Sequence, residues 1–358
     1  MVKPRIHITA VGSPAPDVLQ RLGVRNVAGL AKLAQAGAGD RYKVTASAKM
    51  ILASEVDNQG GRSDDDARAR EIESVLADDR VAALVTIRGG AWFARLLDQI
   101  DWDVLRRRRS MIHIFGFSEM TTLVAIASQY PRAVGLYDLG PTFIFAGMKR
   151  WALQNISTLV DPAKMSADER QGFAAGWATA EFPREFTEFF GEVAGAVEGR
   201  GAPRVPTGEL LAGSLPSRSR ITITGGNLSL LMPLLGSRFA AAIDTRGKWL
   251  AIEDLNEPAD KIDRMIAALK LAGLFERAQG VILGDFHNKD DDLTAAACKV
   301  LRYHLPERRT PIVRINNFGH IWPIAPLPMN RPVTLVCRRR RRGKPSVSIE
   351  IPWREWAR

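Results

Sequence analysis

Ser118 stands at a position where a serine can act as a nucleophile. It lies two residues after Gly116, just past the apolar segment 112–115, and shortly before residues 121–130, which have the composition of a helix. On a tight turn between a strand and a helix, a serine exposes its hydroxyl, and the next backbone amide points at the attacked carbonyl. A serine that only caps a helix gives a similar local pattern. The residues Gly-x-Ser-x-Met alone therefore leave both interpretations open.

A serine nucleophile needs a base within hydrogen-bond reach and a third group that orients the base. His320 follows Gly319 at the end of a predicted strand and precedes a proline-rich segment, where a rigid loop could hold its imidazole. Glu253 ends the apolar segment 249–252, where a carboxylate needs a specific partner. Ser118, Glu253 and His320 are therefore a candidate triad.

The other four histidines fit the role of the base less well. His7 and His113 lie inside predicted strands and are interpreted as core residues. His304 lies in a basic helical stretch, where we expect it to be solvated. His287 follows the predicted strand 281–283 and remains an alternative base, although the acidic segment after it is typical of an exposed loop.

Strands and helices alternate in the first part of the chain, which indicates a parallel sheet with helices on both faces. The pattern predicts strands at 6–11, 81–87 and 111–115, and helices at 18–36 (interrupted at Gly23), 67–76, 93–100 and 121–130. Ligands of such sheets bind at the carboxyl ends of the strands. At one of these ends, Gly89 and Gly90 could let backbone N–H groups approach an oxyanion, although an ordinary turn has the same composition.

The character of the chain changes after Pro141. Residues 142–195 are expected to be mostly helical, and residues 191–219 are rich in Gly, Pro, Ala and Ser. We therefore predict an N-terminal domain at 1–190, a linker at 191–219 and a C-terminal α/β domain at 220–358.

Composition limits the classes of protein to consider. The chain has 358 residues, 46% hydrophobic and 25% charged, which is typical of a globular protein with two domains. No apolar run approaches the length of a membrane span, and the first ten residues lack the pattern of a signal peptide. Cys298 and Cys337 give neither a disulfide framework nor a zinc pattern. We therefore expect a cytoplasmic protein.

Two arginine runs account for most of the net charge of +11. Residues 106–109 supply four positive charges, and residues 338–342 with Lys344 supply six. The second run lies between two strand-like segments and is predicted to be a hairpin turn. Because no aromatic residues are interleaved with it, we interpret it as a solvated turn rather than a nucleic-acid site, with contact to an anionic partner as the alternative.

Taken together, five motifs occur in the order and at the spacing found in one family of enzymes. The chain resembles the LD-carboxypeptidase family of serine peptidases, which includes murein tetrapeptide carboxypeptidases and microcin C immunity-type peptidases. The similarity extends over nearly the whole chain and rests on Ile87-Arg88-Gly89-Gly90, Gly116-Phe117-Ser118-Glu119-Met120-Thr121, Gly225-Gly226-Asn227-Leu228, Ile252-Glu253-Asp254 and Phe318-Gly319-His320.

The resemblance implies an N-terminal flavodoxin-like domain, a C-terminal α/β domain and an active site at their junction. It implies Ser118 as nucleophile, His320 as general base and then acid, and Glu253 as the group that orients His320. The amides of Gly90 and Glu119 would form the oxyanion hole. Because a murein peptide carries carboxylates, Arg88 with Gly89 is the candidate substrate contact, with an ordinary surface arginine as the alternative. A homodimer without metal or cofactor is expected, acting on a small peptide.

The substrate is the least determined part of this expectation. The first expectation is release of terminal D-alanine from cytoplasmic murein tetrapeptide. The alternatives are a peptidase that cleaves an aminoacyl-nucleotide antibiotic, with Trp92 and Trp322 available to stack on a base, and a binding protein without turnover. The chain departs from the family in having Glu119 where aspartate is usual, and Leu139-Gly140-Pro141 where a histidine begins the motif.

Overall fold

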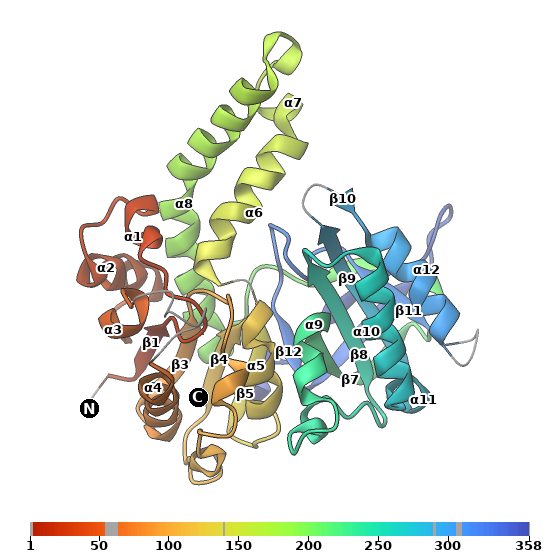
Figure 1. Cartoon of the computed structure of the whole chain (residues 1–358), viewed down its shortest axis with the longest axis horizontal. Coiled ribbons are helices and arrows are strands. Elements are labelled where there is room, and N and C mark those ends of the chain that lie inside the picture. The colour runs from red at the N-terminus through yellow and green to blue at the C-terminus, as the bar shows by residue number, and fades with distance from the viewer. Residues whose placement is uncertain (1–2, 54–63, 139, 289–290, 306–309, 358) are drawn as a thin grey trace.

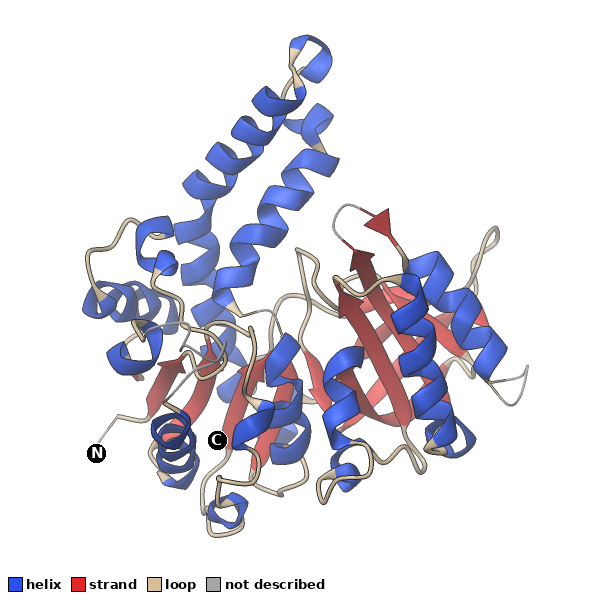
Figure 2. Cartoon of the chain, viewed as in Figure 1, coloured by secondary structure: helices blue, strands red, loops and turns tan. Residues whose placement is uncertain are grey.

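The computed structural model describes residues 3–53, 64–138, 140–288, 291–305 and 310–357. Within them the strands form two sheets, which Figure 2 shows as two groups of red arrows with blue helices around them. The buried apolar side chains of both sheets belong to one continuous cluster. The sheets are therefore packed together, and segments far apart in the sequence meet between them.

The first sheet contains the parallel strands that the sequence pattern predicts. Its order is β2-β1-β3-β4-β5, as in flavodoxin-like folds, with β12 added antiparallel to β5. Every residue of β3, β4 and β5 is buried, because helices cover both faces. The strands are β1 (Arg5–Thr9), β2 (Lys43–Ala46), β3 (Val81–Thr86), β4 (Ile112–Gly116), β5 (Ala133–Tyr137) and β12 (Leu327–Met329).

Most of the predicted helices of this part are confirmed, with one exception. The helices are α1 (Asp17–Arg21), α2 (Val27–Ala38), α3 (Ala48–Ile51), α4 (Asp65–Ala77) and α5 (Thr121–Ala127), and α1 and α2 are separated at Gly23 as expected. The helix predicted at 93–100 is wrong, since only the single turn η1 (Ala94–Leu96) forms there. Its apolar residues have helical spacing, but tertiary packing overrides such a local preference, and these side chains are buried here without a continuous helix.

A long helical hairpin follows the first sheet. Figure 1 shows α6 (Pro141–Gln154) and α8 (Ala167–Val197) running side by side away from the sheets, with α7 (Ile156–Leu159) near the far end. At the start of α8, the Ser166 hydroxyl accepts from the Glu169 N–H and the Glu169 carboxylate accepts from the Ser166 N–H. This reciprocal cap explains why the long helix begins there.

The second sheet closes on itself. Its order is β10-β9-β11-β6-β14-β13-β7-β8, and β8 also pairs with β9, so that the last strand returns to the beginning. Strands β7, β8, β9 and β11 carry the α/β part of this unit. The strands are β6 (Thr207–Ala212), β7 (Arg218–Asn227), β8 (Trp249–Leu255), β9 (Gly280–Asn288), β10 (Asp291–Asp292), β11 (Ile312–Ile315), β13 (Pro332–Arg338) and β14 (Ser346–Glu350).

Short helices connect the strands of the second sheet. They are α9 (Leu228–Leu231), α10 (Ala259–Leu271), α11 (Leu274–Arg277) and α12 (Thr294–His304). Single 3-10 turns occur at η2 (Trp102–Leu105), η3 (Ser118–Met120), η4 (Pro162–Lys164), η5 (Met232–Leu234), η6 (Ala240–Ile243) and η7 (Trp353–Trp356). The predicted hairpin around the second arginine run is confirmed, because β13 and β14 are antiparallel partners on either side of it.

The segment 191–219 has more regular structure than a linker. The last turns of α8 extend to Val197, and β6 lies between β11 and β14 in the second sheet. Of the nine Gly and Pro residues in this segment, four lie between these two elements. The division into domains at 1–190 and 220–358 therefore stays a prediction, while residues 207–212 belong structurally to the second sheet.

Candidate functional site

Ser118 lies on a sharp turn between β4 and α5. Its φ is +54°, in the left-handed region that residues other than glycine seldom adopt. The N-cap of η3 is Phe117 and that of α5 is Met120, and neither cap position uses the Ser118 side chain. Ser118 is therefore not the helix-capping serine of the alternative interpretation. The strained turn holds its side chain at the carboxyl end of the sheet.

The loop after β3 lies directly against Ser118. A Cβ atom placed on Gly89 would be 2.8 Å from the Ser118 Cβ and 3.3 Å from its Oγ. Gly90 has a φ of +97°, and a Cβ atom there would be 2.1 Å from the Ser13 Oγ. Only glycines allow the loop backbone to approach the serine this closely, as a backbone oxyanion site requires.

Glu253 and His320 form a buried hydrogen-bonded pair. His320 Nδ1 is 2.7 Å from Glu253 Oε2, and the His320 backbone N–H donates to the same oxygen at 3.2 Å. An ionised carboxylate can only accept, so Nδ1 carries the hydrogen and Nε2 is left as the basic nitrogen. Gly319 allows this approach, because a Cβ atom there would be 2.9 Å from Glu253 Oε2. The imidazole thus has the orientation and tautomer of a general base.

The Glu253 carboxylate is completely buried and yet is stabilised in its charged form. Its other oxygen, Oε1, accepts from the Tyr137 hydroxyl at 2.5 Å and from Asn227 Nδ2 at 3.1 Å. Burial alone would raise the pKa of Glu253, but the charge of His320 and these hydrogen bonds together hold that pKa below its ordinary value. For His320, burial would lower the pKa, whereas the Glu253 carboxylate raises it above its ordinary value.

Tyr137 joins Ser118 to Glu253, and the sequence analysis did not identify it. Its hydroxyl accepts from the Ser118 N–H at 3.1 Å and donates to Glu253 Oε1. The side chain is fully buried, and burial together with the charge of Glu253 raises its pKa well above the ordinary value. The available signal was its place in the sheet, since Tyr137 ends β5 in register with Gly116, at the end of β4.

Ser118 and His320 line the same cleft, although they do not hydrogen-bond to each other in this structure. The cleft has a volume of about 430 Å³ and is lined by Ser13, Arg21, Arg88, Gly89, Gly90, Phe117, Ser118, Thr142, Phe143, Ala146, Leu255 and His320. Catalytic hydrogen bonds are often long before substrate binds, so this separation is compatible with proton transfer. The arrangement brings together a serine hydroxyl, an oriented imidazole and a glycine loop.

The loop that carries His320 is held by aromatic and ionic contacts. The imidazole ring lies 5.5 Å from the Phe117 ring and 4.9 Å from the Phe143 ring, measured between centroids. Arg150 of α6 donates to the His320 carbonyl oxygen and lies 3.2 Å from Asp285 Oδ2. Residues from both parts of the chain therefore fix the position of the imidazole.

The charged residues that line the cleft are cationic. Arg88 Nη1 donates to the Pro14 carbonyl at 2.7 Å and lies 3.3 Å from Asp17 Oδ1, while Arg21 lies 2.8 Å from Asp17 Oδ2. Two guanidinium groups thus share one carboxylate, which is not itself among the lining residues. The cleft has an excess of positive charge and suits an anionic ligand.

Glu119 has a structural contact that explains its presence beside Ser118. Its carboxylate accepts from the backbone N–H groups of Phe93 at 2.6 Å and Ala94 at 3.1 Å. Burial raises its pKa despite these hydrogen bonds. The side chain therefore holds the turn η1, and only the backbone amide of Glu119 is a candidate for the oxyanion site.

The remaining histidines lie outside the cleft lining. His287 lies inside β9 rather than after it, with Nδ1 2.9 Å from Asp285 Oδ2. His7 contacts Thr45 and Glu71, and His113 is fully buried in β4. The expectation that His304 is solvated is wrong, because it is buried with Nε2 2.7 Å from Asp263 Oδ1.

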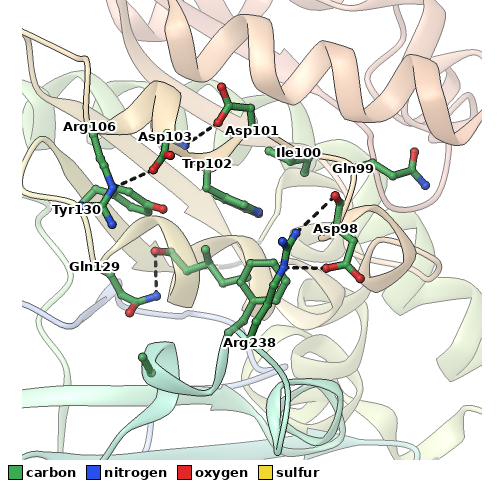
Figure 3. A pocket seen from close by; sticks show the side chains of 13 residues that line it. Asp98, Gln99, Ile100, Asp101, Trp102, Asp103, Arg106, Gln129, Tyr130 and Arg238 are labelled. Carbon is green, nitrogen blue, oxygen red and sulfur yellow. Dashed lines mark hydrogen bonds and ion pairs between the residues drawn. The ribbon is translucent and has the colours of Figure 1, made fainter.

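A larger cleft of about 600 Å³ lies elsewhere on the protein (Figure 3). Its lining contains neither Ser118 nor His320, and its arginines are paired with neighbouring carboxylates. Arg238 lies 2.8 Å from Asp98, and Arg106 lies 2.8 Å from Asp103. Because these charges neutralise each other, we do not take this cleft as the functional site.

The described residues contain neither a candidate metal centre nor a membrane-spanning helix. No group of three or more His, Cys, Asp or Glu side chains in the described ranges is placed to hold a metal ion. Among the helices of the same ranges, none combines the length and the apolar character that crossing a membrane would need.

Two family models match this chain. Residues 6–137 match the model of the LD-carboxypeptidase N-terminal domain, and residues 222–335 match that of the LD-carboxypeptidase C-terminal domain. A probable murein peptide carboxypeptidase of Bacillus subtilis (strain 168) is 28% identical over 270 residues, which are 74% of this chain and 72% of the relative.

Solved structures share the fold. The crystal structure of muramoyltetrapeptide carboxypeptidase from Oxalobacter formigenes has a TM-score of 0.58 at 20% identity, covering 97% of this chain and 99% of that one. The structure of MccF in complex with glutamyl sulfamoyl guanosine has a TM-score of 0.59 at 16% identity, covering 99% of this chain and 97% of that one. MccF is described as a microcin C7 self immunity protein.

Proposed function

This chain belongs to the LD-carboxypeptidase family of serine peptidases, and we propose that it releases terminal D-alanine from a cytoplasmic murein tetrapeptide by cleaving an L,D amide bond. The observation that carries the proposal is the Glu253–His320 pair, in which Oε2 and Nδ1 are 2.7 Å apart. The His320 side of this pair lines the same cleft as Ser118. The murein peptide relative supports this choice of substrate.

In the proposed reaction Ser118 is the nucleophile. His320 Nε2 takes the proton from Oγ as the oxygen attacks the carbonyl carbon, and Glu253 stabilises the imidazolium that forms. The backbone amides of Gly90 and Glu119 bind the oxyanion. His320 then gives its proton to the leaving D-alanine nitrogen as the amide bond breaks. Water, deprotonated by the same imidazole, attacks the acyl carbon, and His320 returns that proton to the departing Ser118 Oγ. No step requires a metal ion.

Arg88 and Gly89 are the proposed substrate contacts. Gly89 lets the loop lie against Ser118, and the Arg88 guanidinium is placed to bind a substrate carboxylate that competes with Asp17. Such a contact selects substrates with a free terminal carboxylate.

Replacing Arg88 with methionine is expected to raise KM about tenfold and to leave kcat nearly unchanged. A hydrogen bond to a charged group contributes about 1.5–3 kcal/mol, and this contact is made equally in the ground and transition states. Steady-state kinetics measure the effect. Asp17→Asn is the control with the opposite sign, because it frees the guanidinium groups and should lower KM. A fall in kcat alone would contradict the proposed role of Arg88.

The pH dependence of kcat/KM is expected to show an acidic limb with its midpoint above 6.5. His320 acts as a base only when neutral, and its pKa lies above the ordinary value of 6.5. Activity should therefore rise with pH through this raised pKa and fall as pH decreases below it. Initial rates at low substrate concentration across a buffer series measure the limb. A midpoint at or below 6.5 would exclude the proposed Glu253–His320 coupling.

Replacing Tyr137 with phenylalanine is expected to lower kcat about tenfold and to move the acidic limb to higher pH. Without the hydroxyl, Glu253 loses a donor and becomes more basic, so a proton shared between Glu253 and His320 is held more tightly. A mere loss of folded enzyme would lower the rate equally at all pH values. The pH profiles of both enzymes, with thermal unfolding of each, separate these cases.

The function is tested by mixing purified protein with murein tetrapeptide and measuring D-alanine release, with Ser118→Ala in parallel. Release by the wild type alone is the expected result. Labelling of Ser118 by a serine-reactive phosphonate without D-alanine release would retain the catalytic mechanism and reject the substrate. Neither labelling nor release would favour a binding protein without turnover.

Cleavage of an aminoacyl-nucleotide antibiotic has less support as a function. The solved MccF complex shares the fold, but the tryptophans considered for stacking on a base do not line the cleft. Trp322 instead packs against Trp151 and Trp177, and its Nε1 donates to Glu185 at 3.2 Å. We therefore place the murein peptide first.

A further inference from the structure

The two arginine runs differ in how their charges are compensated. Arg106, Arg107 and Arg109 each lie within 3.1 Å of a carboxylate oxygen, from Asp103, Asp101 and Asp79 respectively. Arg108 is buried and donates to the backbone carbonyls of Leu76, Asp78 and Val81. Three cations of the first run are therefore paired with carboxylates and the fourth is buried, so this run leaves no unpaired cation on the surface.

Other cationic side chains surround a cleft on the second sheet. The cleft has a volume of about 330 Å³ and lies among α12, β6, β11 and the turn between β13 and β14. We call it the basic cleft, defined by Lys299, Arg302, Arg314 and Lys344 with the single carboxylate Glu209. It shares no residue with the cleft that contains Ser118.

The charges of the basic cleft are poorly compensated. Glu209 lies 3.1 Å from the Lys344 nitrogen, whereas Lys299, Arg302 and Arg314 form no ion pair with any Asp or Glu that the structure describes. Within the part of the chain that the structure describes, Arg302 donates only to the Leu211 carbonyl, at 3.0 Å. Three cationic side chains thus line a small concave site, and of these Arg314 also interacts electrostatically with Asp292.

Arg314 is the cation that β11 supplies to the basic cleft. Its Nε is buried and has no hydrogen-bond partner in the described part of the chain. It is opposite Glu209 in the register of β11 and β6, yet the Glu209 carboxylate bonds to Lys344 instead. The carboxylate that faces Arg314 across the strands is thus engaged elsewhere, and the Arg314 guanidinium adds its charge to the cleft.

A second cleft continues from the first. It has a volume of about 500 Å³ and shares Lys299 and Arg302 with the basic cleft. Its other walls include aliphatic side chains and Tyr303, which is 80% exposed. A ligand whose anionic group binds Lys299 and Arg302 could therefore place an uncharged ring or chain against this apolar wall.

We propose that the basic cleft binds a phosphate group of a small molecule. Guanidinium groups match the geometry of phosphate oxygens, and the cleft has the size of a small-ligand site. The proposal is independent of the peptidase function. The phosphate can be a free anion or part of a nucleotide, with the second cleft accommodating the nucleoside in the latter case.

Isothermal titration of the whole protein with inorganic pyrophosphate at near-physiological salt tests the proposal. Saturable binding of one anion per chain is expected. The double variant Lys299→Gln/Arg302→Gln should weaken it at least about tenfold, as for loss of charge-assisted hydrogen bonds. Both side chains are exposed, so the variant is expected to fold.

The matched control removes the same charge from the neighbouring turn. Arg339→Gln/Arg340→Gln should leave the affinity nearly unchanged, because these residues do not line the cleft. Equal weakening by both double variants, or no saturable binding by the wild type, would overturn the proposal. So would preferential binding of a single-stranded oligonucleotide that depends on the turn arginines.

Titration with ADP distinguishes the two sources of phosphate. Tighter binding of ADP than of pyrophosphate, lost in Tyr303→Ala, would assign the second cleft to a nucleoside. Equal affinities, with no effect of Tyr303→Ala, would assign the site to the free anion. Both outcomes support a phosphate site if the cleft variant weakens binding.

Discussion

Ser118→Ala is expected to lower kcat by about 10⁵-fold or more, with the fold intact. Removing the nucleophile of a serine peptidase leaves only the contribution of substrate binding and of the oxyanion site. Alanine is tolerated at the φ of +54° about as well as serine, so thermal unfolding should change little. Single-turnover release of D-alanine, with the variant in large excess over substrate, measures the residual rate.

Ser13 provides a control in the same cleft. Its hydroxyl lies beside Gly90, and it is the other serine among the lining residues. Ser13→Ala should lower kcat less than tenfold. If Ser13→Ala abolished activity while Ser118→Ala retained it, the nucleophile would be Ser13 and the interpretation of the β4 turn would be wrong.

Glu253→Gln is expected to lower kcat by about 10⁴-fold, as loss of the orienting carboxylate does in serine peptidases. The two oxygens of Glu253 accept four hydrogen bonds, from the His320 N–H and Nδ1, Tyr137 and Asn227. A glutamine amide has only one oxygen, and its NH₂ group would face two of these donors. His320 would then favour the tautomer with the hydrogen on Nε2, which cannot accept the Ser118 proton.

Asp254 is the matched control for this substitution. It is the neighbouring buried carboxylate, but it accepts from the Ser229 N–H at 2.8 Å and has no hydrogen bond to His320. Burial and the charge of Glu253 raise its pKa to about 7, so that its neutral form is already populated near neutral pH. Asp254→Asn should therefore lower kcat less than tenfold. An equal loss in both variants would mean that general disturbance of β8, rather than orientation of His320, explains the effect.

Short-range patterns in the sequence were enough to predict the candidate site residues and the strands and turns that carry them. The apolar segment before Ser118, the glycines at 89–90 and the buried strand before Glu253 all lie within a few residues of the side chains that they position. Strand and turn preferences act over such short distances, so β4, its sharp turn and the end of β8 could be predicted. The helix predicted at 93–100 is wrong because it rested on the same kind of local pattern, which tertiary packing can override.

The tertiary structure decided how these side chains meet. His320 and Glu253 are 67 residues apart, and Tyr137 and Glu253 are 116 residues apart. No local pattern contains the pairing of such distant residues, because it follows from how the two sheets pack. The role of Tyr137 in joining Ser118 to Glu253 therefore became visible only in the structure.

The same distinction holds for charge. The sequence determined that the chain has ten cationic residues in two runs and a net charge of +11. Which of them are compensated depends on carboxylates and carbonyls that folding brings near, as Asp79 does for Arg109 and Glu209 does for Lys344. The sequence thus determined the number of charges and the chemistry of the candidate triad. The tertiary structure alone decided which groups are paired, because hydrogen bonds and ion pairs depend on distances in space.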